Sequence, residues 1–183
     1  MEEPKEQGHL EELHELIKSI STAMFTTRRP DGRLVARPMA TQKRNAIADL
    51  WFVTEVESEK VNELKQDPHV SLSYFDTGSW EWVSVSGTAR VSTDRAAIRE
   101  LYQPDWKAWF ESLDEVRNGG PDDPRLALLL VDAESAIYLK REKSKPRVLF
   151  EVARGMITGE QPEIGKTRAL RLDEDAAEGA HAP

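Results

Sequence analysis

Two short stretches contain residues that could bind an anion. The first, LVARPMA (residues 34–40), alternates its side chains, so that Arg37 shares one face of a predicted strand with Val35 and Met39. An arginine between two apolar residues is unusual for a buried face. Pro38 cannot donate a backbone hydrogen bond, which indicates an edge strand or a bulge where backbone groups are free to meet a ligand. The alternative is a solvated arginine on an exposed edge.

The second stretch, LWFVTEVESEKVNEL (residues 50–64), passes from an apolar strand through acidic residues to a predicted helix start. If Ser58 caps this helix, its hydroxyl, the Lys60 ammonium and the free N–H groups of the first turn converge, and such a helix start favours a phosphate. The alternative is an ordinary serine cap followed by a solvated lysine. The pairing of this turn with Arg37 on a neighbouring strand favours the first interpretation, a phosphate cradle formed by Arg37, Ser58 and Lys60.

Four of the five tryptophans form two pairs. Trp80 and Trp82 are predicted on one face of a strand beside hydroxyl side chains, and Trp106 and Trp109 on one side of a short helix. Large aromatic side chains beside hydroxyls can line a pocket for a planar ring. The alternative is that these pairs belong to the core or to a dimer interface.

The sequence contains no recognisable catalytic arrangement, so catalytic residues stay unassigned. No serine lies in a Gly-x-Ser-x-Gly elbow, and the Gly pair at 119–120 is followed by PDDP, so a dinucleotide fingerprint is absent. The absence of cysteine excludes thiol catalysis and thiolate metal sites. The four histidines lack the paired spacing of a zinc site, and no metal is expected. Redox chemistry would therefore require a bound cofactor.

Composition restricts the possible partners. With 33 acidic and 25 basic residues, the formal net charge of -8 argues against general affinity for nucleic acid or for an anionic membrane. No apolar run is long enough to cross a bilayer, and the N-terminus is acidic where a secretory signal would be basic and then apolar. We therefore expect a cytoplasmic protein.

Hydrophobic periodicity predicts a single domain. Residues 9–160 are expected to form it, with a flexible N-terminus at 1–8 and a C-terminal extension at 161–183 whose last dozen residues are disordered. Helices are predicted at 9–20, 57–66, 94–101 (with Thr93 as N-cap) and in part of 105–113, and strands at 24–29, 34–43, 50–54, 69–76, 81–91, 125–132 and 135–141. About seven strands without regular βαβ alternation favour an antiparallel barrel with peripheral helices.

In the order and spacing of its predicted elements and motifs, the chain resembles the FMN-binding split-barrel proteins related to pyridoxamine 5'-phosphate oxidase. Among them it is most similar to the general stress protein 26 group. The resemblance runs from about residue 10 to about residue 140. It is carried by LVARPMA, LWFVTEVESEKV, WVSVSGTARV and the region from WKAWF to DDPRLALLLVD. It implies a mainly β fold (α+β), a six-stranded antiparallel split barrel with peripheral helices, and a homodimer that binds flavin in clefts between its subunits.

The resemblance also implies roles for individual residues. Arg37, Ser58 and Lys60 would hold the FMN phosphate. The residues expected along the rest of the cofactor are Pro38 and Met39 beside the ribityl chain and isoalloxazine, the backbone of Phe52, Val53 and Thr54 at the polar edge of the ring, and Trp106 and Trp109 reaching in from the partner chain.

Two departures from the oxidases limit the functional inference. Trp82 stands where those enzymes have a glutamine, and GKTRALRLDED has no counterpart of their Arg-rich substrate motif. We therefore expect an FMN-dependent oxidoreductase with a stress-related role, and not pyridoxamine 5'-phosphate oxidation. FAD is an alternative, because it presents the same ring and first phosphate. Two further alternatives are a cofactor-free dimeric stress-response binding module and a barrel for haem, with His69 as axial ligand, or deazaflavin.

Overall fold

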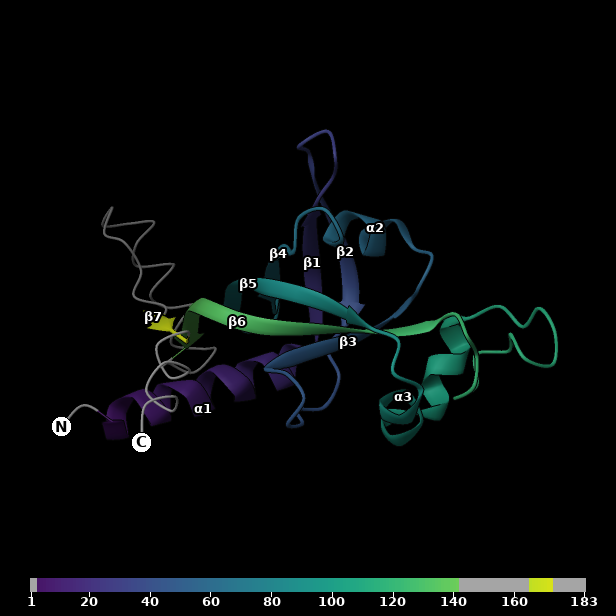
Figure 1. Cartoon of the computed structure of the whole chain (residues 1–183). Coiled ribbons are helices and arrows are strands. Elements are labelled where there is room, and N and C mark those ends of the chain that lie inside the picture. Colours follow the sequence, from purple (N-terminus) through teal and green to yellow (C-terminus); the bar gives the residue numbers. More distant parts are fainter. Residues whose placement is uncertain (1–2, 142–164, 173–183) are drawn as a thin grey trace, which may run out of the picture.

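The computed structural model describes residues 3–141 and 165–172. It consists of one antiparallel sheet with helices around it (Figure 1). In chain order the elements are α1 (Glu3–Ile20), β1 (Thr22–Arg28), β2 (Leu34–Ala40), β3 (Leu50–Glu55), α2 (Glu59–Leu64), β4 (His69–Phe75), β5 (Trp82–Ser92), α3 (Arg95–Leu101), the 3-10 helix η1 (Pro104–Trp109), β6 (Leu126–Arg141) and β7 (Gly165–Arg171). The expected disorder of the last dozen residues falls almost wholly outside the described residues.

The strand order is β2-β1-β4-β5-β6-β3, and every pairing is antiparallel. The sheet curls into a barrel that is split between its two end strands, β2 and β3. Just beyond β2, the backbone N–H of Gln42 donates to the carbonyl oxygen of Trp51 at 3.0 Å and so holds these two edges near each other. The fold is therefore the predicted six-stranded split barrel, with β7 added beside the second half of β6.

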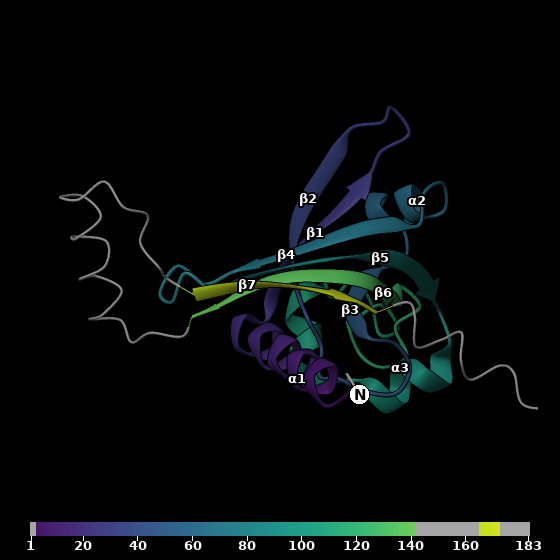
Figure 2. The same cartoon turned by 90° about the vertical axis from the view of Figure 1, so that its left-hand side faces the viewer.

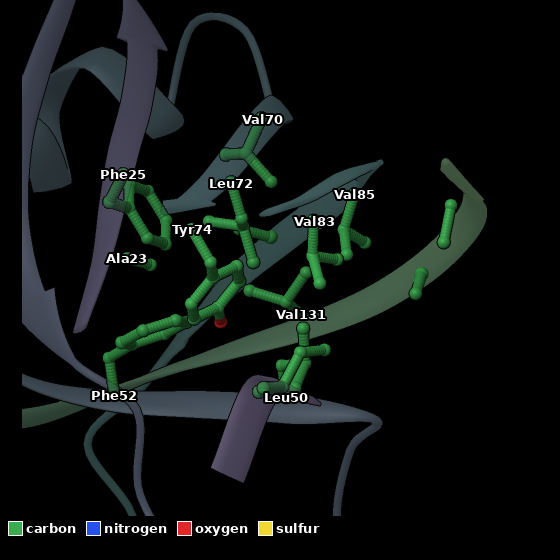
Figure 3. Packing of buried hydrophobic residues seen from close by; sticks show 14 of the residues in the cluster. Ala23, Phe25, Leu50, Phe52, Val70, Leu72, Tyr74, Val83, Val85 and Val131 are labelled. Carbon is green, nitrogen blue, oxygen red and sulfur yellow. The ribbon is translucent and has the colours of Figure 1, made fainter. Parts of the chain in front are cut away.

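Alternation along the strands builds the core. On β1, β4 and β5 every second side chain is buried, as period-2 patterning requires. Figure 3 shows the aromatic and branched side chains of these strands meeting inside the barrel, where Phe25 and Phe52 pack edge to face with ring centroids 5.2 Å apart. Leu13, Leu16 and Ile17 of α1 extend this core. In Figure 2, α1 and α3 both lie below the long strands β5 and β6.

Some sequence-based boundaries are wrong. The two strands predicted at 125–132 and 135–141 are one strand, β6, with a bulge: Ser86 pairs with Ser135 and Gly87 with Ala133, so Glu134 is the extra residue. A Cβ atom on Gly87 would lie 2.2 Å from the carbonyl oxygen of Asp132, so only glycine fits there.

Other differences concern the ends of elements. Asp94, not Thr93, caps α3, because its carboxylate accepts hydrogen bonds from the N–H groups of Ala96 and Ala97. Trp80 lies outside β5, with a positive φ of 64° and a largely exposed side chain, so it does not share a strand face with Trp82. Helix α1 begins inside the segment predicted to be flexible, and β7 lies inside the C-terminal extension.

On one face of the sheet, three successive rows across five strands carry no charged side chain, while Arg28 and Arg141 of the same face flank these rows and Arg171 of β7 pairs with Ser135. Residues in register across an antiparallel sheet point to the same side. Three successive rows from β2 to β6 form this outer sheet face, namely Ala36, Thr26, Ser71, Ser86 and Ser135; Pro38, Met24, Ser73, Ser84 and Ile137; and Ala40, Thr22, Phe75, Trp82 and Leu139. Met24, Phe75 and Ile137 are 42%, 55% and 45% exposed.

Candidate functional site

A cavity of about 530 Å³ lies at the split of the barrel. One wall is β2, from Arg37 to Ala40, and the opposite wall is β3, from Val53 to Glu55. The start of α2 contributes Ser58 and Lys60, and η1 with the residue after it contributes Asp105, Trp106, Trp109 and Phe110; Thr22 and Gln42 complete the lining. The cavity thus lies where the sheet leaves two neighbouring edges unpaired.

The Arg37 side chain lines the cavity and is held in place by hydrogen bonds to Thr27 and Glu63. Its Nη1 donates to Thr27 Oγ1 at 2.6 Å, and its Nη2 donates to Glu63 Oε2 at 3.0 Å. Thr27 Oγ1 in turn donates to Glu63 Oε2 at 2.5 Å. The Arg37 side chain is 21% exposed and that of Glu63 only 5%. The guanidinium is therefore neutralised on its protein side and keeps a solvent-accessible edge.

Lys60 belongs to a second group of polar atoms in the same cavity. Its Nζ donates to Thr54 Oγ1 at 2.8 Å, and Thr54 Oγ1 lies 3.3 Å from Ser58 Oγ. Ser58 occupies the N-cap position of α2, but its hydroxyl makes no capping hydrogen bond and is directed to Thr54 instead. The predicted capping role of the Ser58 side chain is therefore wrong, although its hydroxyl does lie beside the ammonium.

The electrostatics of the cavity indicate an anion site. Burial lowers the pKa of the Lys60 ammonium, and the positive charge of Arg37 lowers it further, against the opposing effects of Glu55 and Glu63. The Glu63 carboxyl has a lowered pKa too: burial alone would raise it, but the hydrogen bonds from Thr27 and Arg37 outweigh burial. Two neighbouring cations that repel each other form a site to which an added anion is attracted.

The aromatic wall of the cavity comes from η1. Trp106 is buried among Trp51 and Tyr102, with ring centroids 6.0 Å and 5.5 Å away, and its Nε1 donates to Gln42 Oε1 at 3.0 Å. Trp109, one turn further on, is 84% exposed. The buried ring of Trp106 and the solvent-exposed ring of Trp109 thus both line the η1 side of the cavity.

The structure brings nine of the ten predicted cofactor-binding residues to this one cavity: Arg37, Pro38, Met39, Val53, Thr54, Ser58, Lys60, Trp106 and Trp109. Phe52 is not among the lining residues. Its side chain is fully buried in the barrel core, and the predicted contact of its backbone with a flavin stays a prediction. Both tryptophans line the cavity of their own chain, whereas the resemblance implied that they reach it from a partner.

Sequence reasoning missed two residues behind the cradle, Glu63 and Thr27. Glu63 follows Lys60 by three positions and so lies near it on the helix surface, and Thr27 continues the inward alternation of Ala23 and Phe25. These signals were weak, because nothing in the local sequence shows that α2 packs against β1 and β2.

The described parts of the chain hold no other evident chemistry. Among them, no three His, Asp or Glu side chains are grouped in a way that could hold a metal ion. None of the helices in residues 3–141 and 165–172 combines the length and apolar character needed to span a membrane. His69, the proposed haem ligand, is an exposed residue whose Nδ1 lies 2.7 Å from Asp67 Oδ1.

A split barrel with a cationic and aromatic cavity at its opening is typical of the split-barrel class that the sequence predicted. Comparison with known proteins agrees with this class. The family model for pyridoxamine 5'-phosphate oxidase-like proteins matches residues 8–163. The chain belongs to the pyridoxamine 5'-phosphate oxidase-like family. This confirms the resemblance inferred from the sequence.

Among individual proteins, the chain is similar to protein bli-3 of Neurospora crassa, with 37% identity over 168 residues that cover 90% of this chain and 80% of that protein. Its fold is similar to a protein described as general stress protein 26 from Jannaschia sp. CCS1 (TM-score 0.68, 24% identity, 90% and 99% coverage). It is also similar to the general stress FMN/FAD binding protein of Xanthomonas citri (TM-score 0.61, 31% identity, 75% and 92% coverage).

Proposed function

We propose that this protein binds FMN in the cavity at the split of the barrel and acts as a flavin-dependent oxidoreductase. The observation that carries the proposal is the convergence of two cations, Arg37 and Lys60, with the hydroxyls of Thr54 and Ser58 at one cavity. An arginine and a lysine beside hydroxyl donors suit a phosphate monoester. The FMN/FAD-binding relative supports the choice of a flavin.

The residues present fit such a cofactor. Arg37, Ser58 and Lys60 would hold the phosphate, and the aromatic wall with Met39 and Val53 would contact the ring. A bound flavin supplies the ability to accept and donate electrons singly or as a hydride, which no side chain of this cavity provides. The role of the protein is to position the cofactor, to exclude water on the Trp106 side and to leave the Trp109 side open.

The names of relatives support a stress-related role, since two of the similar proteins are called general stress proteins. FAD would present the same first phosphate to the cradle and is the alternative cofactor.

The flavin proposal is tested by comparing FMN with riboflavin, which lacks the phosphate. Both are titrated into purified protein and followed by flavin fluorescence. FMN should bind at least about tenfold more tightly, because a charge-assisted contact contributes about 1.5–3 kcal/mol. The absence of binding by either flavin would overturn the proposal and favour a cofactor-free module. Equal affinities would overturn the role of the cradle.

We also propose that a second copy of the chain covers the outer sheet face. Three neighbouring rows without a charged side chain are unusual in a chain with 32% charged residues, and large exposed apolar patches mark interaction surfaces. Three of its residues, Thr22, Pro38 and Ala40, also line the cavity, so a partner on this face would adjoin the flavin site. Sedimentation of dilute protein should give twice 20.7 kDa. A monomer that binds FMN at full affinity would contradict this arrangement.

A further inference from the structure

The carboxylate of Glu63 lies directly behind the phosphate cradle, although it cannot itself bind an anion. Its Oε2 accepts from Thr27 Oγ1 and Arg37 Nη2, and Arg37 Nη1 donates to Thr27 Oγ1, so the three groups form a closed ring of hydrogen bonds. Glu63 and Thr27 are only 4% and 1% exposed. A buried carboxylate keeps its charge only when cations and donors compensate it, and Arg37 is the cation in contact with it.

Glu63 has opposite effects on the two states of the cradle. Without a bound anion it neutralises Arg37 and offsets the repulsion between Arg37 and Lys60. Once an anion is bound, Glu63 becomes a like charge in the same poorly solvated region and repels it. A group that stabilises the free state and destabilises the bound state lowers the binding affinity.

We propose that Glu63 is the resident counter-anion of the phosphate cradle, which holds Arg37 in place without ligand and limits the affinity of the cradle for phosphate monoesters. The inference rests on the proposed function of Arg37 and Lys60 as phosphate ligands. Its functional consequence is reversible loading. The empty protein keeps an ordered and neutralised site, and the phosphate of the cofactor exchanges instead of being held permanently.

The Glu63→Gln substitution separates charge from shape, because the amide oxygen still accepts the hydrogen bonds of Thr27 and Arg37. FMN affinity should rise about tenfold, the effect of removing one poorly solvated like charge of about 1.4 kcal/mol. Riboflavin affinity should stay unchanged. The Tm of the cofactor-free protein should fall, and inorganic phosphate should raise it more than it raises the Tm of the wild type.

Two controls accompany this variant. Glu59→Gln, on an exposed residue of the same helix, changes the net charge equally and should leave the FMN affinity within about twofold. If the cofactor-free Glu63→Gln protein does not fold, it is prepared with FMN present and the rate of FMN release is measured, which should be about tenfold slower than in the wild type.

The outcomes distinguish this inference from the proposed function. Unchanged or weaker FMN binding by Glu63→Gln, with wild-type FMN binding intact, overturns the counter-anion and leaves the flavin site standing. If neither protein binds FMN but inorganic phosphate stabilises Glu63→Gln more than the wild type, the counter-anion stands and the flavin proposal fails. Equal effects of phosphate and of FMN on both proteins overturn the inference.

Discussion

In the part of the chain that the structure describes, two Arg–carboxylate centres contain an almost fully buried carboxylate, and they are built in different ways. In the loop before β6, Asp123 accepts hydrogen bonds on both of its carboxylate oxygens. The donors are the backbone N–H groups of Gly119 and Arg125, at 2.7 and 2.9 Å, and the Arg125 guanidinium, at 3.1 and 2.7 Å. Behind the cavity wall, Glu63 accepts on Oε2 from Thr27 and Arg37, residues 36 and 26 positions away.

The difference shows which centre serves folding and which serves a ligand. The Asp123 carboxylate is fully buried, all its donors lie within four residues, and the Arg125 side chain is only 12% exposed. The Glu63 centre joins α2, β1 and β2 and borders a cavity that holds a second cation, Lys60. A locally satisfied ion pair needs no further partner, whereas a pair with a spare cation beside it attracts an anion.

The largest effect is expected from Arg37→Met. This substitution should remove both the ion pair with Glu63 and the contact of Arg37 with the phosphate. It leaves the buried Glu63 carboxylate without its cation, so the free energy of unfolding should fall by about 3 kcal/mol. FMN affinity should also fall about a hundredfold through the lost charge-assisted contact. Urea unfolding and FMN titration measure the two effects.

Two variants sharpen this prediction. Arg33→Met removes an exposed arginine from the same hairpin, whose partner Asp31 is also exposed, and should change neither quantity. Adding Glu63→Leu to Arg37→Met should restore most of the stability but not the FMN affinity, since an apolar pair can replace a buried ion pair. Full FMN affinity in Arg37→Met would contradict the cradle.

An intermediate effect is expected at the loop centre. Burial alone would raise the pKa of Asp123, but the hydrogen bonds from Arg125 and Gly119 outweigh it and lower the pKa to about 2. Because the pKa of Asp123 in the folded protein lies below the ordinary aspartate pKa of 3.8, ionised Asp123 stabilises the fold above about pH 4. This contribution of about 2 kcal/mol is lost as the pH falls from 4 towards 2.

Asp123→Asn should therefore lower the free energy of unfolding by about 2 kcal/mol at pH 7, and the difference from the wild type should shrink below pH 4. Urea unfolding at several pH values measures this. Asp122→Asn, at the exposed neighbour that pairs with Arg99, is the control and should have little effect. FMN affinity should not change in either variant. A large loss of affinity in Asp123→Asn would mean that the two centres are coupled.

The smallest effect is expected from Lys60→Met, which concerns binding only. Since the fold lowers the pKa of Lys60, mainly by burial, its charge does not stabilise the cofactor-free protein. The free energy of unfolding should stay within about 0.5 kcal/mol of the wild type, while FMN affinity falls about tenfold. Riboflavin affinity should stay constant. Lys65→Met, an exposed lysine just after α2, is the matched control, and an equal loss of FMN affinity there would point to net charge alone.

The strands were predictable because alternation is a local property. The period-2 pattern of HVSLSYF and WVSVSGTARV located β4 and β5 within a residue or two. The bulge in β6 was not predictable, because the extra residue, Glu134, is defined only by pairing with β5. Strand β7 was missed because GKTRALR carries little apolar pattern and is ordered by its partner β6.

The sequence by itself determined the antiparallel barrel, because hydrophobic periodicity is a property of short segments. It also identified the cations Arg37 and Lys60 and the aromatic pair Trp106 and Trp109, because residue types are read directly from the sequence. Only the tertiary structure decided that the split between β2 and β3 brings these residues to one cavity, and that Glu63 neutralises Arg37 from behind. The physical reason is range: backbone preferences act over a few residues, whereas charge pairing acts through space between segments that meet only when the core packs.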